Sequence, residues 1–128
     1  MKAENMEERI PLDLKIRTKQ FALRMIRLYT SLPKTTEAQV IGKQVLRSGT
    51  SVGAQYREAQ RAKSDADFIN KVEGSLQELD ETGYWLELLK DSGIFPAEKL
   101  ESLLKETDEL TAIFVTIVKK VKSKKTSR

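Results

Sequence analysis

Apolar residues recur every three or four positions along most of the chain, and this spacing predicts four long helices. The first stripe covers about residues 14–32, where Phe21, Met25 and Leu28 follow one another at helical spacing. Pro33 comes directly after it, and the residue before a proline disfavours helical backbone. The sequence therefore predicts a first helix that ends at this proline.

The second stripe, over about residues 35–62, contains three glycines. Thr35 or Thr36 can cap the start of this helix. Glycine inside a helix costs up to about 1 kcal/mol relative to alanine. A kink near Ser48–Ser51 is therefore the alternative to a continuous helix. The three positions are Gly42, Gly49 and Gly53.

Two further helices follow, each with a start signal. Ser64 begins the third, and its S-D-A-D run has the form of a capping box with Asp in place of Glu. That helix runs to about Lys90, with Gly93 just beyond its end. Pro96 starts the fourth, which continues to about Lys122. Short connections make neighbouring helices antiparallel, so we expect an all-α, up-down-up-down four-helix bundle.

The chain has the length of one domain. Its 128 residues divide into an N-terminal arm over 1–13, expected to be flexible, the bundle over 14–122 and a basic C-terminal tail over 123–128. The longest apolar run is too short for a membrane helix, and the N-terminus lacks the apolar segment of a secretory signal. We expect a cytoplasmic protein.

The composition removes most catalytic chemistry. There is no histidine and no cysteine, which excludes the usual serine and cysteine triads, thiolate zinc sites and the Glu-x-x-His ligands of di-iron bundles. The glycines do not have the spacing of a phosphate-binding loop. The sequence predicts a protein that is not an enzyme and uses no cofactor or metal.

Charge is unevenly distributed along the chain. Residues 15–63 carry eleven basic and two acidic side chains, whereas residues 64–118 carry four and thirteen. Four cations of the second helix step along one side of it, with the smaller Thr50 and Ala54 between them. We call this set the basic ridge: Lys43, Arg47, Arg57 and Arg61.

Two interpretations of the basic ridge are open. Its cations can pair with the acidic third and fourth helices, within or between subunits. They can equally bind the phosphates of RNA or DNA, which suit the forked guanidinium group of arginine. The tail, KKVKSKKTSR, is either a nucleic-acid-binding arm or a helix end whose lysines match the helix dipole.

Two surfaces suggest self-association. Gly42, Gly49, Gly53 and Tyr56 lie beside the core stripe of the second helix, where they line either the core or a subunit interface. The end of the third helix is apolar on all sides, which indicates burial by a deeper core or by another subunit. Its apolar residues include Tyr84, Trp85, Leu86, Leu88 and Leu89. The predicted interface residues are Gly49, Gly53, Tyr56, Tyr84 and Trp85.

A family resemblance rests on two segments, SGTSVGAQYREAQRAKSDADFINKV and ELDETGYWLELLKDSGIFP. Over about residues 18–120 the chain resembles the bacterial 23S rRNA intervening-sequence proteins. The resemblance implies a four-helix bundle in a ring-shaped homopentamer and offers no catalytic residues. Related accessory variability proteins of diversity-generating retroelements associate with a reverse transcriptase and nucleic acid. The positions that match the recurrent motif are Arg47, Tyr56, Arg57, Glu58, Arg61, Asp67 and Phe68.

Two functional hypotheses follow. The first is a non-catalytic, oligomeric accessory protein that contacts the backbone of RNA or DNA through the basic ridge. The alternative is an oligomeric scaffold that binds a protein partner, such as a polymerase, without touching nucleic acid. Salt dependence separates them, because phosphate contacts release counterions.

Overall fold

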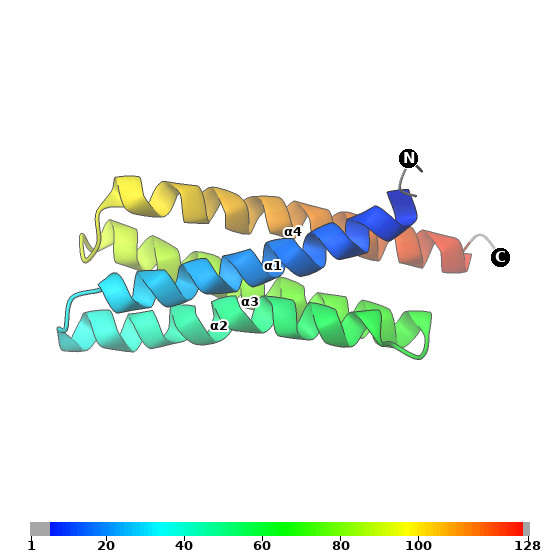
Figure 1. Cartoon of the computed structure of the whole chain (residues 1–128), viewed down its shortest axis with the longest axis horizontal. Helices are drawn as coiled ribbons and strands as arrows, with labels where there is room; N and C mark the ends of the chain where they lie inside the picture. Colours follow the sequence, from blue (N-terminus) through cyan, green and yellow to red (C-terminus); the bar gives the residue numbers. More distant parts are fainter. Residues whose placement is uncertain (1–5, 127–128) are drawn as a thin grey trace.

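The computed structural model describes residues 6–126, with side chains described over 13–124. Its four helices are α1 (Met6–Ser31), α2 (Thr36–Gln60), α3 (Asp65–Asp91) and α4 (Ala97–Thr126). They run alternately up and down, and no strand occurs in this part of the chain (Figure 1). The expected all-α four-helix fold is confirmed.

The helix ends follow the expected capping chemistry. The side chain of Thr35 accepts a hydrogen bond from the backbone N–H of Ala38, and that of Ser64 accepts one from Asp67. The carboxylate of Asp67 in turn accepts from the backbone N–H of Lys63 at 3.4 Å. Gly93 has a φ of 75°, the left-handed conformation in which glycine follows a helix end.

Two boundaries differ from the sequence-based expectation. Helix α1 begins at Met6 rather than near residue 14, because Pro11 removes only one N–H donor and the chain remains helical on both sides of it. Helix α4 continues through Thr126, since lysine is a good helix former and its charge matches the helix C-terminus. Helix α2 is continuous through all three glycines. Residues 1–5 and 127–128 lie outside the described part.

The three glycines of α2 let α1 approach closely. A Cβ atom added at Gly49 would overlap Cγ of Met25, and one added at Gly53 would lie 3.1 Å from Oγ1 of Thr18. Gly42 faces Leu32 in the same way. We call these three positions the glycine seam. The close packing of α1 side chains against them offsets the free-energy cost of placing glycine inside a helix.

Small hydroxyl residues play a similar part between α2 and α3. The hydroxyls of Ser48 and Thr82 are hydrogen-bonded at 2.7 Å in the interior. Ser75 donates to the backbone carbonyl of Val52 at 3.0 Å. All three side chains are buried, and each polar group has a partner, so their burial carries little desolvation penalty.

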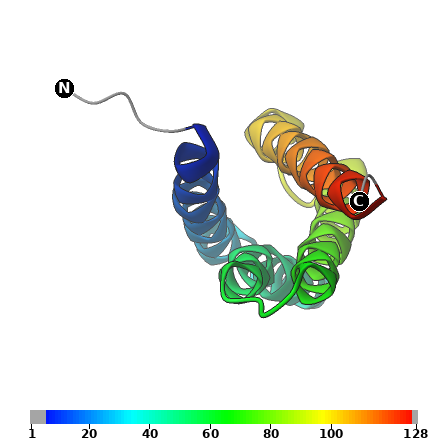
Figure 2. The same ribbon diagram turned by 90° about the vertical axis from the view of Figure 1, so that its right-hand side faces the viewer.

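The helices form an open arc rather than a closed square. Close packing joins α1 to α2, α2 to α3 and α3 to α4. Viewed from the end, α1 and α4 flank the open side of the arc (Figure 2). Long side chains cross this side: Arg17 reaches Glu106 at 2.6 Å, and Arg24 donates to Ser102 at 2.6 Å.

The glycine seam gives a stability prediction with a matched control. Gly49→Ala should lower the free energy of unfolding by about 1–2 kcal/mol, because overpacking against Met25 outweighs the gain in helix propensity. Gly83→Ala should raise it by up to about 1 kcal/mol, since the nearest atom to its added Cβ is 3.7 Å away. Urea denaturation of both variants measures the difference. Equal stabilisation by both substitutions would contradict the close approach.

Candidate nucleic-acid interface

The basic ridge lies on the outer face of α2, and one of its members is engaged with α3. All four side chains are exposed. Arg47 forms ion pairs with Glu81 at 2.9 Å and with Glu78 at 3.4 Å. The pairing interpretation therefore holds for this residue, whose guanidinium group joins α2 to α3.

The other members of the basic ridge face solvent. Within residues 13–124, no hydrogen bond or ion pair involves the side chain of Lys43, Arg57 or Arg61. Arg57 and Arg61 lie one turn apart at the C-terminal end of α2. They present two guanidinium groups to solvent at that end of the bundle.

The antiparallel topology brings this end of α2 beside the C-terminal end of α4 (Figure 1). Lysines of α4 are exposed there, and Lys122 forms a long ion pair with Glu73 of α3 at 3.7 Å. Two basic segments that lie far apart in the sequence thus meet at one end of the molecule. We call this set the basic end: Arg57, Arg61, Lys63, Lys119, Lys120, Lys122 and Lys124.

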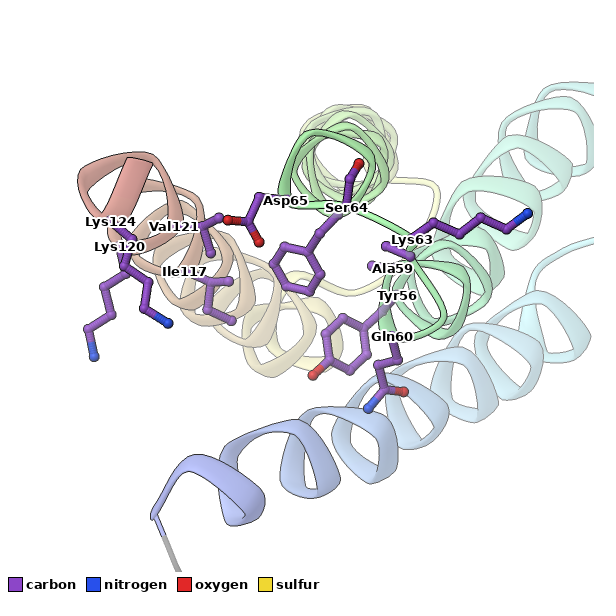
Figure 3. A pocket seen from close by; sticks show the side chains of 12 residues that line it. Tyr56, Ala59, Gln60, Lys63, Ser64, Asp65, Ile117, Lys120, Val121 and Lys124 are labelled. Atoms are coloured by element: carbon purple, nitrogen blue, oxygen red, sulfur yellow. The ribbon is translucent and has the colours of Figure 1, made fainter. Parts of the chain in front are cut away.

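A pocket of about 900 Å³ opens at the basic end, between the α2–α3 connection and the last turns of α4. Phe68, Ile117 and Val121 contribute apolar side chains to its wall. Figure 3 shows Lys120 and Lys124 along the α4 edge, while Lys63 extends outward over the end of α2. The remaining lining residues are Tyr56, Ala59, Gln60, Ala62, Ser64 and Asp65.

Tyr56 forms the inner wall of this pocket and belongs to the core. It is 3% exposed, and its ring packs on Phe114 with centroids 5.4 Å apart. Burial raises the pKa of Tyr56 to about 12. The phenol is therefore neutral at physiological pH and adds no negative charge beside the lysines.

Part of the predicted subunit interface lies inside the chain. Gly49 and Tyr56 are buried, and Gly53 is closely covered by Thr18 of α1. These three positions have packing partners within the chain: side chains of α1 for the two glycines, and Phe114 of α4 for Tyr56. The spacing alone allowed both interpretations, and the contacts of these residues within the chain fit the core interpretation.

The aromatic part of the predicted interface is more accessible. Tyr84 is 54% exposed, and its ring contacts that of Trp85 edge-on with centroids 5.1 Å apart. Trp85 is half-buried and packs against the core. Its indole N–H is buried without a hydrogen-bond acceptor in the described residues. The deeper-core interpretation thus accounts for the burial of most of the Trp85 side chain, whereas the Tyr84 side chain lies on the surface.

The Arg17 bridge, formed by Arg17 with Glu106 and Glu109, closes the middle of the open side. The guanidinium group donates to both carboxylate oxygens of Glu106, at 2.6 and 2.8 Å, and to Glu109 at 3.2 Å. The hydrogen bond from Arg17 lowers the pKa of the Glu106 carboxyl, while partial burial opposes this change. This bridge ties α1 to α4 before the helices reach the pocket.

Other kinds of site find little support in the described residues. Over residues 13–124, no three acidic side chains are grouped as metal ligands would be. No helix in the described part is long and apolar enough to cross a bilayer. The polar chemistry present is that of a charged surface.

Sequence comparison decides the family. The profile of the 23S rRNA-intervening sequence protein family matches residues 12–116, most of the chain and all of the central motif. The chain belongs to the 23S rRNA-intervening sequence protein family. The resemblance carried by the central segments is thereby confirmed.

A solved structure of a related chain agrees with this membership. It is a crystal structure of a protein of unknown function from the S23 ribosomal protein family of Bacteroides thetaiotaomicron VPI-5482. The two share 41% sequence identity and superpose with a TM-score of 0.80, over 85% of this chain and 97% of the other. No curated protein matches the chain. This chain and the solved structure thus share the four-helix fold.

The lowered pKa of Glu106 gives a pH prediction. Because its folded pKa lies below the unfolded value of about 4.3, the Arg17 bridge contributes fully above that value and is lost as pH falls through the folded pKa. The contribution should be on the order of 1 kcal/mol or less, since Arg17 is 37% exposed. Thermal unfolding between pH 7 and about pH 3 should show a smaller loss of stability in Glu106→Gln than in the parent.

Glu109→Gln is the matched control for this prediction. Its carboxylate is 50% exposed and receives the longer of the contacts from Arg17. It should follow the pH dependence of the parent closely. An unchanged pH dependence in Glu106→Gln would show that the Arg17 bridge adds nothing to stability.

Proposed function

We propose that this protein is a non-catalytic, cytoplasmic accessory protein that binds the backbone of RNA or DNA through its basic end. The observation that carries the proposal is the pair Arg57 and Arg61, exposed one turn apart without an acidic partner in the described residues. Guanidinium groups bind phosphate with two parallel hydrogen bonds. Lysines of α4 at the same end extend the positive surface.

The distribution of acidic residues favours an external partner for this end. Arg47 shows how a cation of α2 pairs when α3 offers glutamates beside it. The acidic residues of α3 and α4 are spread along these helices, and several of them form ion pairs with Arg17 or Arg47. Membership of the 23S rRNA-intervening sequence family supports the proposal, since its name associates its members with ribosomal RNA genes.

The proposed contacts are to backbone rather than to sequence. Arginine and lysine side chains position a phosphate chain but carry no base information by themselves. Affinity should therefore fall steeply with salt and depend little on sequence. A protein without histidine and cysteine suits binding rather than catalysis, and we propose no enzymatic activity, cofactor or metal.

A second candidate function is that of an oligomeric scaffold for a protein partner. The exposed Tyr84 favours it, since its ring contacts that of Trp85 edge-on, and the indole N–H of Trp85 has no acceptor among the described residues. Aromatic residues on a surface are typical of interfaces between proteins. The family resemblance implies that copies of the chain assemble into a pentamer. Self-association is compatible with both candidates. For the nucleic-acid proposal, a ring would repeat the basic end, and several weak phosphate contacts would then raise the overall affinity together.

The principal test compares two charge-neutralised double variants. Arg57→Gln/Arg61→Gln should weaken binding to RNA and DNA, and should reduce the slope of log K against log salt by up to about 1.4 for a single strand, or about 0.7 per lost contact. Lys34→Gln/Lys90→Gln removes the same charge from exposed residues at the other end of the bundle and should change the slope little. Fluorescence anisotropy over a salt series measures both.

Arg47→Gln completes this comparison. Because Arg47 forms ion pairs with Glu78 and Glu81, this substitution should lower the free energy of unfolding and leave the slope of log K against log salt unchanged. Binding by the Arg57→Gln/Arg61→Gln variant at the parent's affinity would reject the nucleic-acid proposal and favour the scaffold.

Self-association is tested at the aromatic surface. Tyr84→Lys should shift the sedimentation equilibrium toward a monomer, because a charge would be buried in the interface. Ile16→Lys, at a 53% exposed position on α1, is the control and should leave the assembly intact. A parent mass near 14.6 kDa at micromolar concentration would refute the assembly itself.

A further inference from the structure

The pocket at the basic end exposes large apolar residues that helical spacing assigns to the core. Phe68, Ile117 and Val121 pack against the core cluster yet are only partly buried. They are accessible because α1 and α4 do not pack together along this side of the arc (Figure 2). A concave apolar wall edged by a few polar groups is the usual composition of a ligand pocket.

The dimensions of the pocket limit its occupant. Its volume of about 900 Å³ lies in the range of sites that enclose ligands of nucleotide size. Its α4 wall extends from Ile117 to Lys124, about two helical turns. A docked amphipathic helix with anchors at i, i+4 and i+7 would span about the same length, so charge and the aromatic ring decide between the two occupants.

The charge around the pocket selects the chemistry of the occupant. The described lining holds three lysines and one acidic residue, Asp65. Lys120 and Lys124 lie along the α4 edge of the pocket (Figure 3). Lys63 lies at the opposite edge, over the end of α2, and Arg61 precedes it by two residues in the sequence. An apolar wall between two cationic edges complements a ligand with a flat apolar body and flanking negative charge.

We propose that this pocket holds an unstacked base of a single-stranded nucleic acid, with the ring of Phe68 as its stacking surface. The flanking phosphates lie along Lys120 on one side and along Lys63 and Arg61 on the other. Aromatic side chains bind bases of single strands in this way, with little dependence on sequence. The inference rests on the proposed phosphate binding at the basic end and adds a preference for single strands.

An acidic protein helix is the competing occupant. It would match the lysines equally well, but it offers a planar group to Phe68 only where it carries an aromatic side chain, whereas every base has a planar face. The base also relates the pocket to the exposed arginines, because a phosphate chain that leaves the pocket over Lys63 arrives at the C-terminal end of α2, where Arg61 and Arg57 are exposed. Duplexes keep their bases stacked, so they can use the arginines and not the pocket.

The test uses three probes of nearly equal phosphate number: an oligothymidine, an abasic strand of the same length and a duplex of half that length. The parent should bind the oligothymidine at least about fivefold more tightly than the abasic strand, given the usual contribution of one base stacked on an aromatic ring. Phe68→Leu should reduce this ratio to near one, because it keeps an apolar side chain and removes the aromatic face. Phe68→Tyr should restore the ratio.

The control substitution is at the opposite end of the bundle. Phe95 is also half-buried and lies beside a lysine, with Nζ of Lys99 5.9 Å from its ring centroid. Phe95→Leu should leave the ratio between oligothymidine and abasic strand unchanged. Helical circular dichroism and the unfolding midpoint of each variant confirm that the fold is retained.

The outcomes separate this inference from the proposed function. Equal, salt-dependent binding of all three probes, lost in Arg57→Gln/Arg61→Gln, would leave backbone binding in place and overturn the base pocket. Absence of binding by every probe would reject both. Binding of an acidic amphipathic peptide that depends on Phe68, with the strand ratio near one, would assign the pocket to a protein partner and overturn the inference.

Discussion

The arrangement of the four helices depends on how closely α1 and α3 approach α2. Glycines on one side of α2 and buried hydroxyl residues on the other shorten both distances at once. Such contacts are specific because protein interiors pack near crystal density and leave no room for an added methyl group. With α2 as the close neighbour of both, α1 and α3 turn around it, and the bundle opens on the side between α1 and α4 (Figure 2).

This opening determines where the surface chemistry is found. Along the middle of the open side, the Arg17 bridge joins α1 to α4. Beyond it, the apolar wall around Phe68 is accessible. Because successive helices alternate in direction, α2 and α4 run the same way and their C-terminal ends lie at this end of the bundle (Figure 1). The positive charge of two distant segments and an apolar pocket thus meet through topology rather than through sequence proximity.

Periodicity and end signals predicted the helices because both are local. Thr35, Ser64 and Gly93 occupy the positions expected of them. The roles of surface residues were less predictable, because they depend on partners far along the chain. Arg47 pairs with a glutamate 31 residues away, and Gly49 accommodates Met25 of a different helix. The pocket was not predicted, since Phe68 belongs to an ordinary core stripe until the separation of α1 and α4 is known.

In the open arc, the helices differ in how many other helices they pack against. Helices α2 and α3 each pack closely on two others, whereas α1 and α4 each have one close neighbour and a polar bridge. Local opening is easiest where the fewest apolar contacts must break. Amide hydrogens of the outer helices should therefore exchange through partial openings that leave α2 and α3 folded. The α2–α3 hairpin is then the cooperative unit that persists longest, and it carries the arginines of the basic end.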